Sequence, residues 1–169
     1  TNVVQRIRGM AAPQLPHPAA LDLNAVVEEA LLFVRHDIGM RGIALSTALD
    51  AGLPRVLGDC VQLQQVIVNL LVNSLQALAQ ADTTGGRIEL ASGVAGDRVF
   101  LSVCDNGAGI AEEAFDRIFD SFFTTKADGM GIGLAVYQSI IAAHGGRIVA
   151  SNHPEGGAMF RFTLPAAGA

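Results

Sequence analysis

A regular spacing of apolar residues between Cys60 and Ala81 is the clearest pattern in the chain. Apolar side chains recur there at steps of three and four residues, which is the period of one face of an α-helix. The spacing therefore predicts a long helix that has Asp59 as its N-cap, ends near Ala79 and packs this stripe into the core. The stripe consists of Leu63, Val66, Ile67, Leu70, Leu71, Leu75 and Leu78.

Two further helices and several strands are expected around this long helix. One helix is capped by Asn24 and runs to about Ile38, and another begins at Gly133 and ends at the C-cap Gly145. Alternating apolar and polar residues predict strands at 43–47, 55–57, 87–92, 99–104, 147–152 and 159–164, and the last four form two hairpins. Hairpins interleaved with helices predict an α+β fold. We expect a two-layer α/β sandwich, with three main helices on one face of a mixed, mostly antiparallel sheet of about five strands.

Prolines mark the expected start of this unit. Three of them lie between residues 13 and 18, and because proline sustains neither a helix nor a central strand, an extended connection is expected up to Ala20. The segment Thr1 to Met10 has apolar residues at helical spacing, which predicts the end of a helix. We expect residues 1–20 to be this helix end and linker, 21–165 to be one domain, and 166–169 to be a tail.

Composition excludes several classes of protein. The formal net charge of −5 argues against a nucleic-acid-binding module, which needs a basic patch to neutralise phosphates. No stretch reaches the roughly 18 continuous apolar residues of a membrane span, and no secretory signal pattern begins the chain. These features predict a soluble, cytoplasmic domain, while membrane spans elsewhere in a parent protein stay open. Cys60 and Cys104 lack the spacing of a metal site and are expected to be buried and reduced.

The face of the long helix opposite the apolar stripe is polar but uncharged. It carries Asn69 and Asn73 one turn apart, with glutamines at the same period. Asparagine is a poor helix former, and an amide oxygen can bind Mg²⁺ without adding negative charge beside phosphates. A ligand site on this face and a solvated surface are both consistent with the pattern.

A glycine-containing turn follows the strand that ends at Cys104. Its residues, D-N-G-A-G-I, place Asp105 at the edge of the sheet, and Gly107 and Gly109 allow the backbone to approach a ligand closely. The carboxylate of Asp105 can accept a hydrogen bond from an exocyclic amine such as that of adenine. An ordinary Asx turn that closes a strand is the alternative.

A second glycine motif, G-M-G-I-G-L, spans Gly129 to Leu134 at the start of the third predicted helix. Free backbone N–H groups at a helix N-terminus bind phosphate, although glycine pairs also occur in plain turns. The segment before it, I-F-D-S-F-F-T-T-K, contains aromatic residues that are typical of a loop that docks over a ligand. It ends at Lys126, which either reaches a phosphate or is a solvated lysine.

The four segments N-L-L-V-N, D-N-G-A-G-I, I-F-D-S-F-F-T-T-K and G-M-G-I-G-L occur in this order along the chain. The series resembles the N, G1, F and G2 boxes of the histidine kinase catalytic domain, in the Bergerat-fold (GHKL) superfamily shared with gyrase, Hsp90 and MutL. The resemblance covers residues 21–165 and implies a Bergerat fold. The F-F-T-T-K stretch and the A-A-H-G-G ending are most similar to the nitrogen-regulation and rhizobial oxygen-sensing branch.

The resemblance implies ATP and Mg²⁺ as cofactors and assigns roles to individual residues. Asn73 would be the Mg²⁺ ligand and Asn69 its phosphate-side neighbour, and Lys126 would substitute for a lysine that many members carry where this chain has Gln76. Asn69, Asn73 and Lys126 are thus the implied catalytic residues. The implied nucleotide-binding residues are Asn73, Asp105, Gly107, Gly109, Ile110, Phe119, Thr124, Thr125, Lys126, Gly129, Met130, Gly131, Ile132, Gly133 and Leu134, and Phe119 belongs to the lid with Phe122 and Phe123.

The resemblance also implies a protein kinase activity. Related ATPases place a glutamate, the general base for water, where this chain has Asn69, and an amide cannot accept a proton from water. This favours phosphate transfer to a protein histidine over hydrolysis, with an ATPase of the superfamily, an anti-sigma-like serine kinase and a non-catalytic nucleotide-binding module as alternatives.

The phosphoacceptor is expected outside this chain. The family's acceptor motif, a histidine followed by Glu and later Pro, is absent, and the chain's histidines are expected to be structural or exposed. The implied partners are the protein's own dimerisation domain, which would carry the acceptor histidine, and the receiver domain of a response regulator. We expect the parent protein to be a homodimer, and we expect no nucleic acid among its partners. The chain's histidines are His17, His36, His144 and His153.

Overall fold

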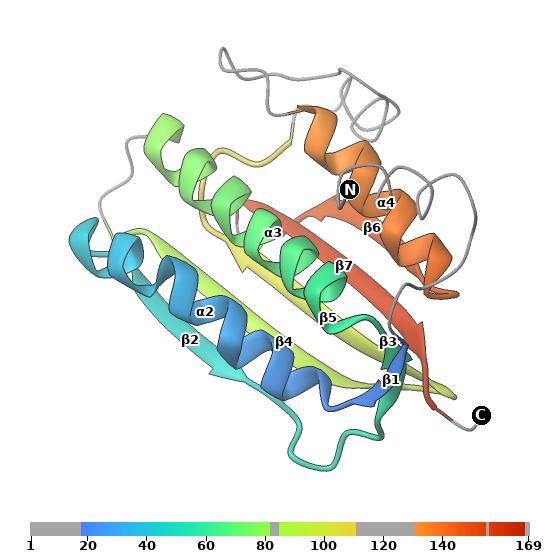
Figure 1. The fold of residues 1–169 in the computed structure, drawn as a ribbon. Coiled ribbons are helices and arrows are strands. Elements are labelled where there is room, and N and C mark those ends of the chain that lie inside the picture. Colours follow the sequence, from blue (N-terminus) through green and yellow to red (C-terminus); the bar gives the residue numbers. More distant parts are fainter. Residues whose placement is uncertain (1–17, 82–84, 111–130, 155, 168–169) are drawn as a thin grey trace, which may run out of the picture.

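The computed structural model describes residues 18–81, 85–110, 131–154 and 156–167. A mixed sheet in the order β2-β4-β5-β7-β6 forms one layer, and three helices cover one of its faces (Figure 1). Only β2 and β4 pair in parallel; the other neighbours in this sheet are antiparallel. The predicted two-layer sandwich is therefore confirmed. The strands are β2 (Ala44–Ala48), β4 (Arg87–Ala95), β5 (Arg98–Asp105), β6 (Arg147–Asn152) and β7 (Ala158–Pro165), and the helices are α2 (Leu23–Met40), α3 (Cys60–Ala81) and α4 (Gly131–Ala143).

The core lies between the sheet and the helices. Every second residue of β5 and β7 is buried and points toward the helices, for example Leu101 and Phe162, which oppose each other in the register. The predicted stripe of α3 is confirmed, because all its members are at most 5% exposed. Burying one such aliphatic side chain contributes about 1.5–3 kcal/mol, so α3 is held mainly by this contact.

The cap of α2 differs from the prediction. The helix begins at Leu23, and Asp22 is its N-cap, with its carboxylate accepting a hydrogen bond from the Asn24 N–H. The side chain of Asn24 instead donates to the carbonyl of Asp50 and accepts from the hydroxyl of Ser92. Asp and Asn are equally good caps, so tertiary partners decided between them.

Some strands are longer than predicted, and one was missed. β1 (Ala19–Leu21) pairs with β3 (Val56–Gly58) in a separate two-stranded sheet, although this segment was predicted to be linker as far as Ala20. The β4–β5 hairpin includes Gly93, which was expected in the connecting loop. Gly93 pairs with Phe100, whose ring covers it so closely that a Cβ would lie 2.7 Å from the ring carbon Cε2. The ring of Phe100 packs over Gly93, so the pairing of β4 with β5 continues through a glycine, a residue that normally weakens a strand.

α4 begins at Gly131, two residues before the predicted start. It ends at Ala143, and the predicted cap residue, Gly145, terminates it. Gly145 has φ +78°, its N–H bonds to the carbonyl of Ala142, and the N–H of Gly146 bonds to that of Ile141. These bonds form a Schellman motif, which satisfies the last carbonyls of the helix.

In the part of the chain that the structure describes, no helix is long and apolar enough to cross a membrane.

His144 connects the end of α4 to the start of α3. Its side chain is 5% exposed; Nε2 accepts a hydrogen bond from the Asp59 N–H at 3.0 Å, and Nδ1 lies 2.8 Å from the carbonyl of Ile140. An imidazole that accepts at Nε2 and donates at Nδ1 is neutral. Burial lowers the pKa of His144 below its ordinary value of 6.5, against smaller opposing effects of the Ile140 carbonyl and Asp59. The long helix and α4 are therefore joined through a histidine that must remain uncharged.

This contact predicts a pH-dependent stability. The unfolded chain takes up a proton at His144 at higher pH than the folded chain does, so stability is complete above pH 6.5 and declines as the pH falls from there toward the lower folded pKa. We expect the free energy of unfolding by urea to fall between about pH 7 and pH 5, by up to about 1.4 kcal/mol per pH unit from this residue.

Replacing the histidine isolates its share of the pH dependence. His144→Gln is expected to be less stable at pH 7 and to show a flatter profile below it, whereas His36→Gln, at an exposed position, keeps the profile of the parent chain. An unchanged slope in the His144 variant would contradict the assignment.

Candidate functional site

Asp105 is the last residue of β5, the central strand, and is fixed where that strand ends. Its side chain is 5% exposed, and Oδ1 accepts hydrogen bonds from the N–H groups of Gly107 at 2.9 Å and Ala158 at 3.4 Å. The bond to Gly107 forms the Asx turn that the sequence also allows at this position. A surface turn does not require a buried carboxylate, however, and the bond to Ala158 ties Asp105 to the neighbouring strand β7. Asp105 is thus both a turn residue and a fixed, buried anion.

The turn after Asp105 crosses the C-terminal half of α3. A Cβ on Gly107 would lie 3.0 Å from the backbone carbonyl oxygen of Ala77, which is tighter than most Cβ contacts, so glycine lets the two backbones approach this closely without displacement. Asn69, Asn73 and Ala77 follow one another at steps of four residues and share one face of α3. The asparagines are 8% and 5% exposed, which excludes a solvated helix surface. A row of buried amides therefore leads along α3 to the turn that carries Asp105.

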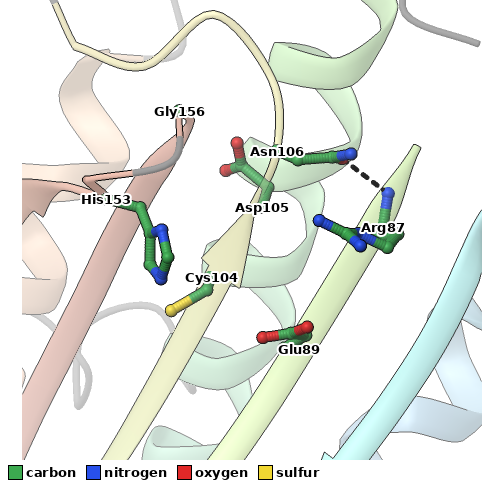
Figure 2. Close-up of a pocket in the computed structure, with 7 residues that line it drawn as sticks. All are labelled: Arg87, Glu89, Cys104, Asp105, Asn106, His153 and Gly156. Atoms are coloured by element: carbon green, nitrogen blue, oxygen red, sulfur yellow. Dashed lines mark hydrogen bonds between the residues drawn. The ribbon is translucent and has the colours of Figure 1, made fainter. Parts of the chain in front are cut away.

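Asn106 fastens the same turn to the start of β4. Its Oδ1 accepts a hydrogen bond from the Arg87 N–H at 2.6 Å (Figure 2), and its Nδ2 donates to the carbonyl of Gly85 at 3.1 Å. The side chain thus replaces a neighbouring strand for these two backbone groups. These two bonds fix the orientation of the turn relative to the start of β4.

A small pocket lies behind this turn, where Glu89 of β4, Cys104 of β5 and His153, which follows β6, come together (Figure 2). Glu89 and Cys104 oppose each other in the register and alternate with residues buried against the helices, so they point to the other face of the sheet. The cavity has a volume of about 50 Å³, far below the several hundred Å³ of a typical ligand site. It holds at most a few waters. A ligand much larger than a few waters would not fit this cavity.

The cysteines do not add chemistry to the site. Both are free, as predicted, but both are partly exposed and not buried, because Cys104 lies on the outer sheet face and Cys60 opens α3. Burial raises the pKa of the Cys104 thiol, and the carboxylates of Glu89 and Asp105 raise it further. A raised thiol pKa lowers the thiolate fraction at neutral pH, so Cys104 is a poor nucleophile.

Comparison with known proteins agrees with this geometry. The profile of the family described as "Histidine kinase-, DNA gyrase B-, and HSP90-like ATPase" matches residues 58–168. The sensor protein FixL of Bradyrhizobium diazoefficiens is 40% identical over 168 residues, which cover 98% of this chain and 32% of FixL. The chain thus spans about a third of that relative's length.

Solved structures narrow the family further. The catalytic domain of histidine kinase ThkA is 31% identical, with a TM-score of 0.79 over 89% of this chain and 96% of that domain. The chain is a histidine kinase catalytic domain. Full-length ShkA in complex with AMPPNP matches with a TM-score of 0.79 at 28% identity, over 99% of this chain and 36% of ShkA. ThkA in complex with the response regulator TrrA matches with a TM-score of 0.76 at 26% identity, over 98% of this chain and 47% of ThkA.

The structure of this catalytic domain brings some of the predicted site residues together. Asn69 and Asn73 lie on the face of α3 that the segment Asp105 to Ile110 crosses at Ala77. Gly131, Ile132, Gly133 and Leu134 lie in the first turn of α4, where only the backbone is described. Phe119, Thr124, Thr125, Lys126, Gly129 and Met130 fall outside the described residues. Among the residues that the structure does describe, no group of three or more His, Cys, Asp or Glu could hold a metal ion.

Sequence reasoning gave no role to several residues that shape the site. Asn106 lies within the D-N-G-A-G-I motif, but nothing in the sequence pattern predicts its bonds to Arg87 and Gly85. Asn152 is hydrogen-bonded to Ile110 across 42 positions of sequence. No periodicity connects residues this far apart, so only the folded backbone reveals the pairing.

The bonds of Asn106 predict a measurable contribution to stability. Asn106→Ala is expected to lower the free energy of unfolding by about 1–3 kcal/mol, because the Arg87 N–H and the Gly85 carbonyl both lose a partner. Asn106→Asp keeps the acceptor for Arg87 and is expected to lose less. Urea unfolding followed by circular dichroism measures both variants, and a wild-type stability of Asn106→Ala would contradict the role assigned to this side chain.

Proposed function

We propose that this domain binds Mg²⁺-ATP between α3 and the lid segment and supplies the γ-phosphoryl group to a histidine on a separate dimerisation domain. The observation that carries the proposal is the row of Asn69, Asn73 and Ala77, crossed at Ala77 by the turn that holds Asp105. This arrangement offers a buried anion for a base and buried amides for a metal and phosphates, on one side of the sheet. The AMPPNP bound to the similar kinase ShkA supports a nucleotide at this fold.

Asp105 would recognise the adenine ring. A carboxylate offers about four acceptor positions, so Asp105 can accept the exocyclic amine of adenine while Oδ1 also accepts the backbone N–H groups of Gly107 and Ala158. Gly107 and Gly109 keep the turn free of side chains beside the base. Ile110 would cover the base from the end of the same turn.

Asn73 would bind Mg²⁺, with Asn69 beside the phosphates. Mg²⁺ prefers oxygen ligands and commonly retains several waters, so one amide oxygen with phosphate oxygens is a fitting donor set. The first turn of α4, Gly131 to Leu134, has backbone N–H groups without partners inside the helix, and these would receive the phosphates. Bound Mg²⁺ would neutralise charge on the phosphates, while the side chains of the domain position and orient ATP.

The segment before α4 would complete the site. We propose that Phe119, Thr124, Thr125 and Lys126 belong to the lid, with Lys126 contacting a phosphate in place of the lysine replaced by Gln76, and that Gly129 and Met130 lead into the α4 cradle. This assignment rests on the family resemblance alone.

Transfer to a protein is proposed in preference to hydrolysis. Asn69 stands where hydrolysing relatives are expected to carry a glutamate, and a buried amide cannot accept a proton from water. A GHKL-type ATPase or an anti-sigma-like serine kinase is the alternative that the experiment below distinguishes.

The acceptor histidine is proposed to lie on the protein's own dimerisation domain, within a homodimeric parent protein. Both ring nitrogens of the buried His144 are engaged by backbone groups, so this histidine cannot act as the acceptor. The response regulator would receive the phosphoryl group next, a proposal supported by the solved complex of ThkA with TrrA.

Asp105→Asn tests the adenine assignment. The amide oxygen can still accept from Gly107, but the other position becomes a donor that faces the donating amine of adenine. We expect the dissociation constants of ADP and ATP, measured by calorimetry, to rise by about 10- to 100-fold. Glu89→Gln makes the same chemical change on the outer face of the sheet and is expected to leave affinity unchanged. Equal affinities for the Asp105 variant and the parent chain would contradict the assignment.

Phosphate transfer is tested with labelled ATP and Mg²⁺, with and without a dimerisation domain that bears an acceptor histidine. We expect nucleotide binding without self-labelling of the catalytic domain, and labelling of the added domain in trans. Rapid release of phosphate by the catalytic domain alone would overturn the kinase proposal in favour of an ATPase.

A further inference from the structure

The end of the β6–β7 hairpin holds the turn that follows Asp105. Asn152, the last residue of β6, accepts a hydrogen bond from the Ile110 N–H at Oδ1, at 2.7 Å, and donates from Nδ2 to the Ile110 carbonyl, at 2.9 Å. One side-chain amide thus satisfies both backbone groups of Ile110, as a neighbouring strand would. A two-point contact fixes the orientation of the peptide as well as its position.

The glycines of both segments fit this contact. Gly109 has φ +80°, and a Cβ there would lie 2.9 Å from the Asn152 Oδ1 atom. Gly157 has φ +96°, and a Cβ there would overlap the backbone carbonyl oxygen of Asp105. The hairpin and the turn can therefore touch only because both positions lack side chains.

Both ends of the turn are anchored to the hairpin. At the first end, the N–H of Ala158 donates to Oδ1 of Asp105, and at the other end Asn152 holds Ile110. Between these points lie Gly107 and Gly109, which leave the backbone intrinsically free. Ordering each free residue costs about 1–2 kcal/mol, so a turn that is already fixed binds a ligand at a smaller entropic cost.

We propose that Asn152 is a positioning residue for the adenine pocket, which it preorganises by clamping Ile110. The inference rests on the proposed nucleotide site and goes beyond it, because Asn152 lies outside all the segments that carry the family resemblance. Asn152 acts through the backbone of Ile110, without touching the nucleotide. Its side chain is exposed, so its removal opens no cavity in the core.

The test compares Asn152→Ala with Asn24→Ala. Asn24 also makes two long-range side-chain hydrogen bonds, both 2.7 Å, but to Asp50 and Ser92, several residues along β4 from the site. Comparing these two variants separates the effect of losing two hydrogen bonds from the effect of losing order in the adenine pocket. Calorimetry gives the dissociation constants of ADP and ATP, and hydrogen exchange by NMR gives the protection of the Ile110 amide without nucleotide.

We expect Asn152→Ala to weaken ADP and ATP equally, by about tenfold, and to abolish protection of the Ile110 amide. Asn24→Ala is expected to keep both the affinity and that protection, with a comparable loss of thermal stability. Wild-type affinity in Asn152→Ala, or equal losses of affinity in both variants, would overturn the inference while leaving the proposed function intact. Failure of the parent chain to bind any adenine nucleotide would instead overturn the proposed function, and the inference with it.

Discussion

The close approach of the Gly107 backbone to the carbonyl of Ala77 determines how the rest of this site is arranged. Because no side chain separates them, the turn after β5 lies directly on α3, in line with Asn69 and Asn73. A Cβ at position 107 would lie 3.0 Å from the Ala77 carbonyl oxygen, so a larger residue would require the turn or the helix to shift by a few tenths of an ångström. The apolar stripe of α3 is buried against the sheet, and this packing holds the helix close enough for the turn to contact it at Ala77.

Two side-chain amides and one imidazole hold this arrangement from different sides. Asn106 joins the turn to β4, Asn152 joins it to the β6–β7 hairpin, and His144 joins α4 to the cap of α3. Each bonds to backbone groups of a segment distant in sequence, which gives fixed geometry without added charge. A site for a highly charged ligand benefits from such neutral supports, since further carboxylates would repel phosphates.

The hydrophobic period of α3 and the strand hairpins were predictable because local spacing encodes them. The two-layer fold followed from their order. The Asp59 cap was predictable from its residue type, and its Oδ1 accepts a hydrogen bond from the Gln62 N–H at 3.0 Å. The sequence predicts a loop at Gly93, since its pairing depends on the ring of Phe100 across the ladder. It also predicts Asn24 as the cap that Asp22 provides. The contacts of Asn106, Asn152 and His144 were beyond sequence reasoning, because each depends on a partner brought close only by folding.

The central claim is that nucleotide binds on the helix side of the sheet, along the row of α3 and the turn after Asp105. Titration of the ¹⁵N-labelled domain with Mg²⁺-AMPPNP, followed by NMR, tests it most directly. We expect the largest shifts at the side-chain amides of Asn69 and Asn73 and at the backbone amides of residues 105–110. Shifts centred on Glu89 and Cys104, on the opposite face of the sheet, would contradict it.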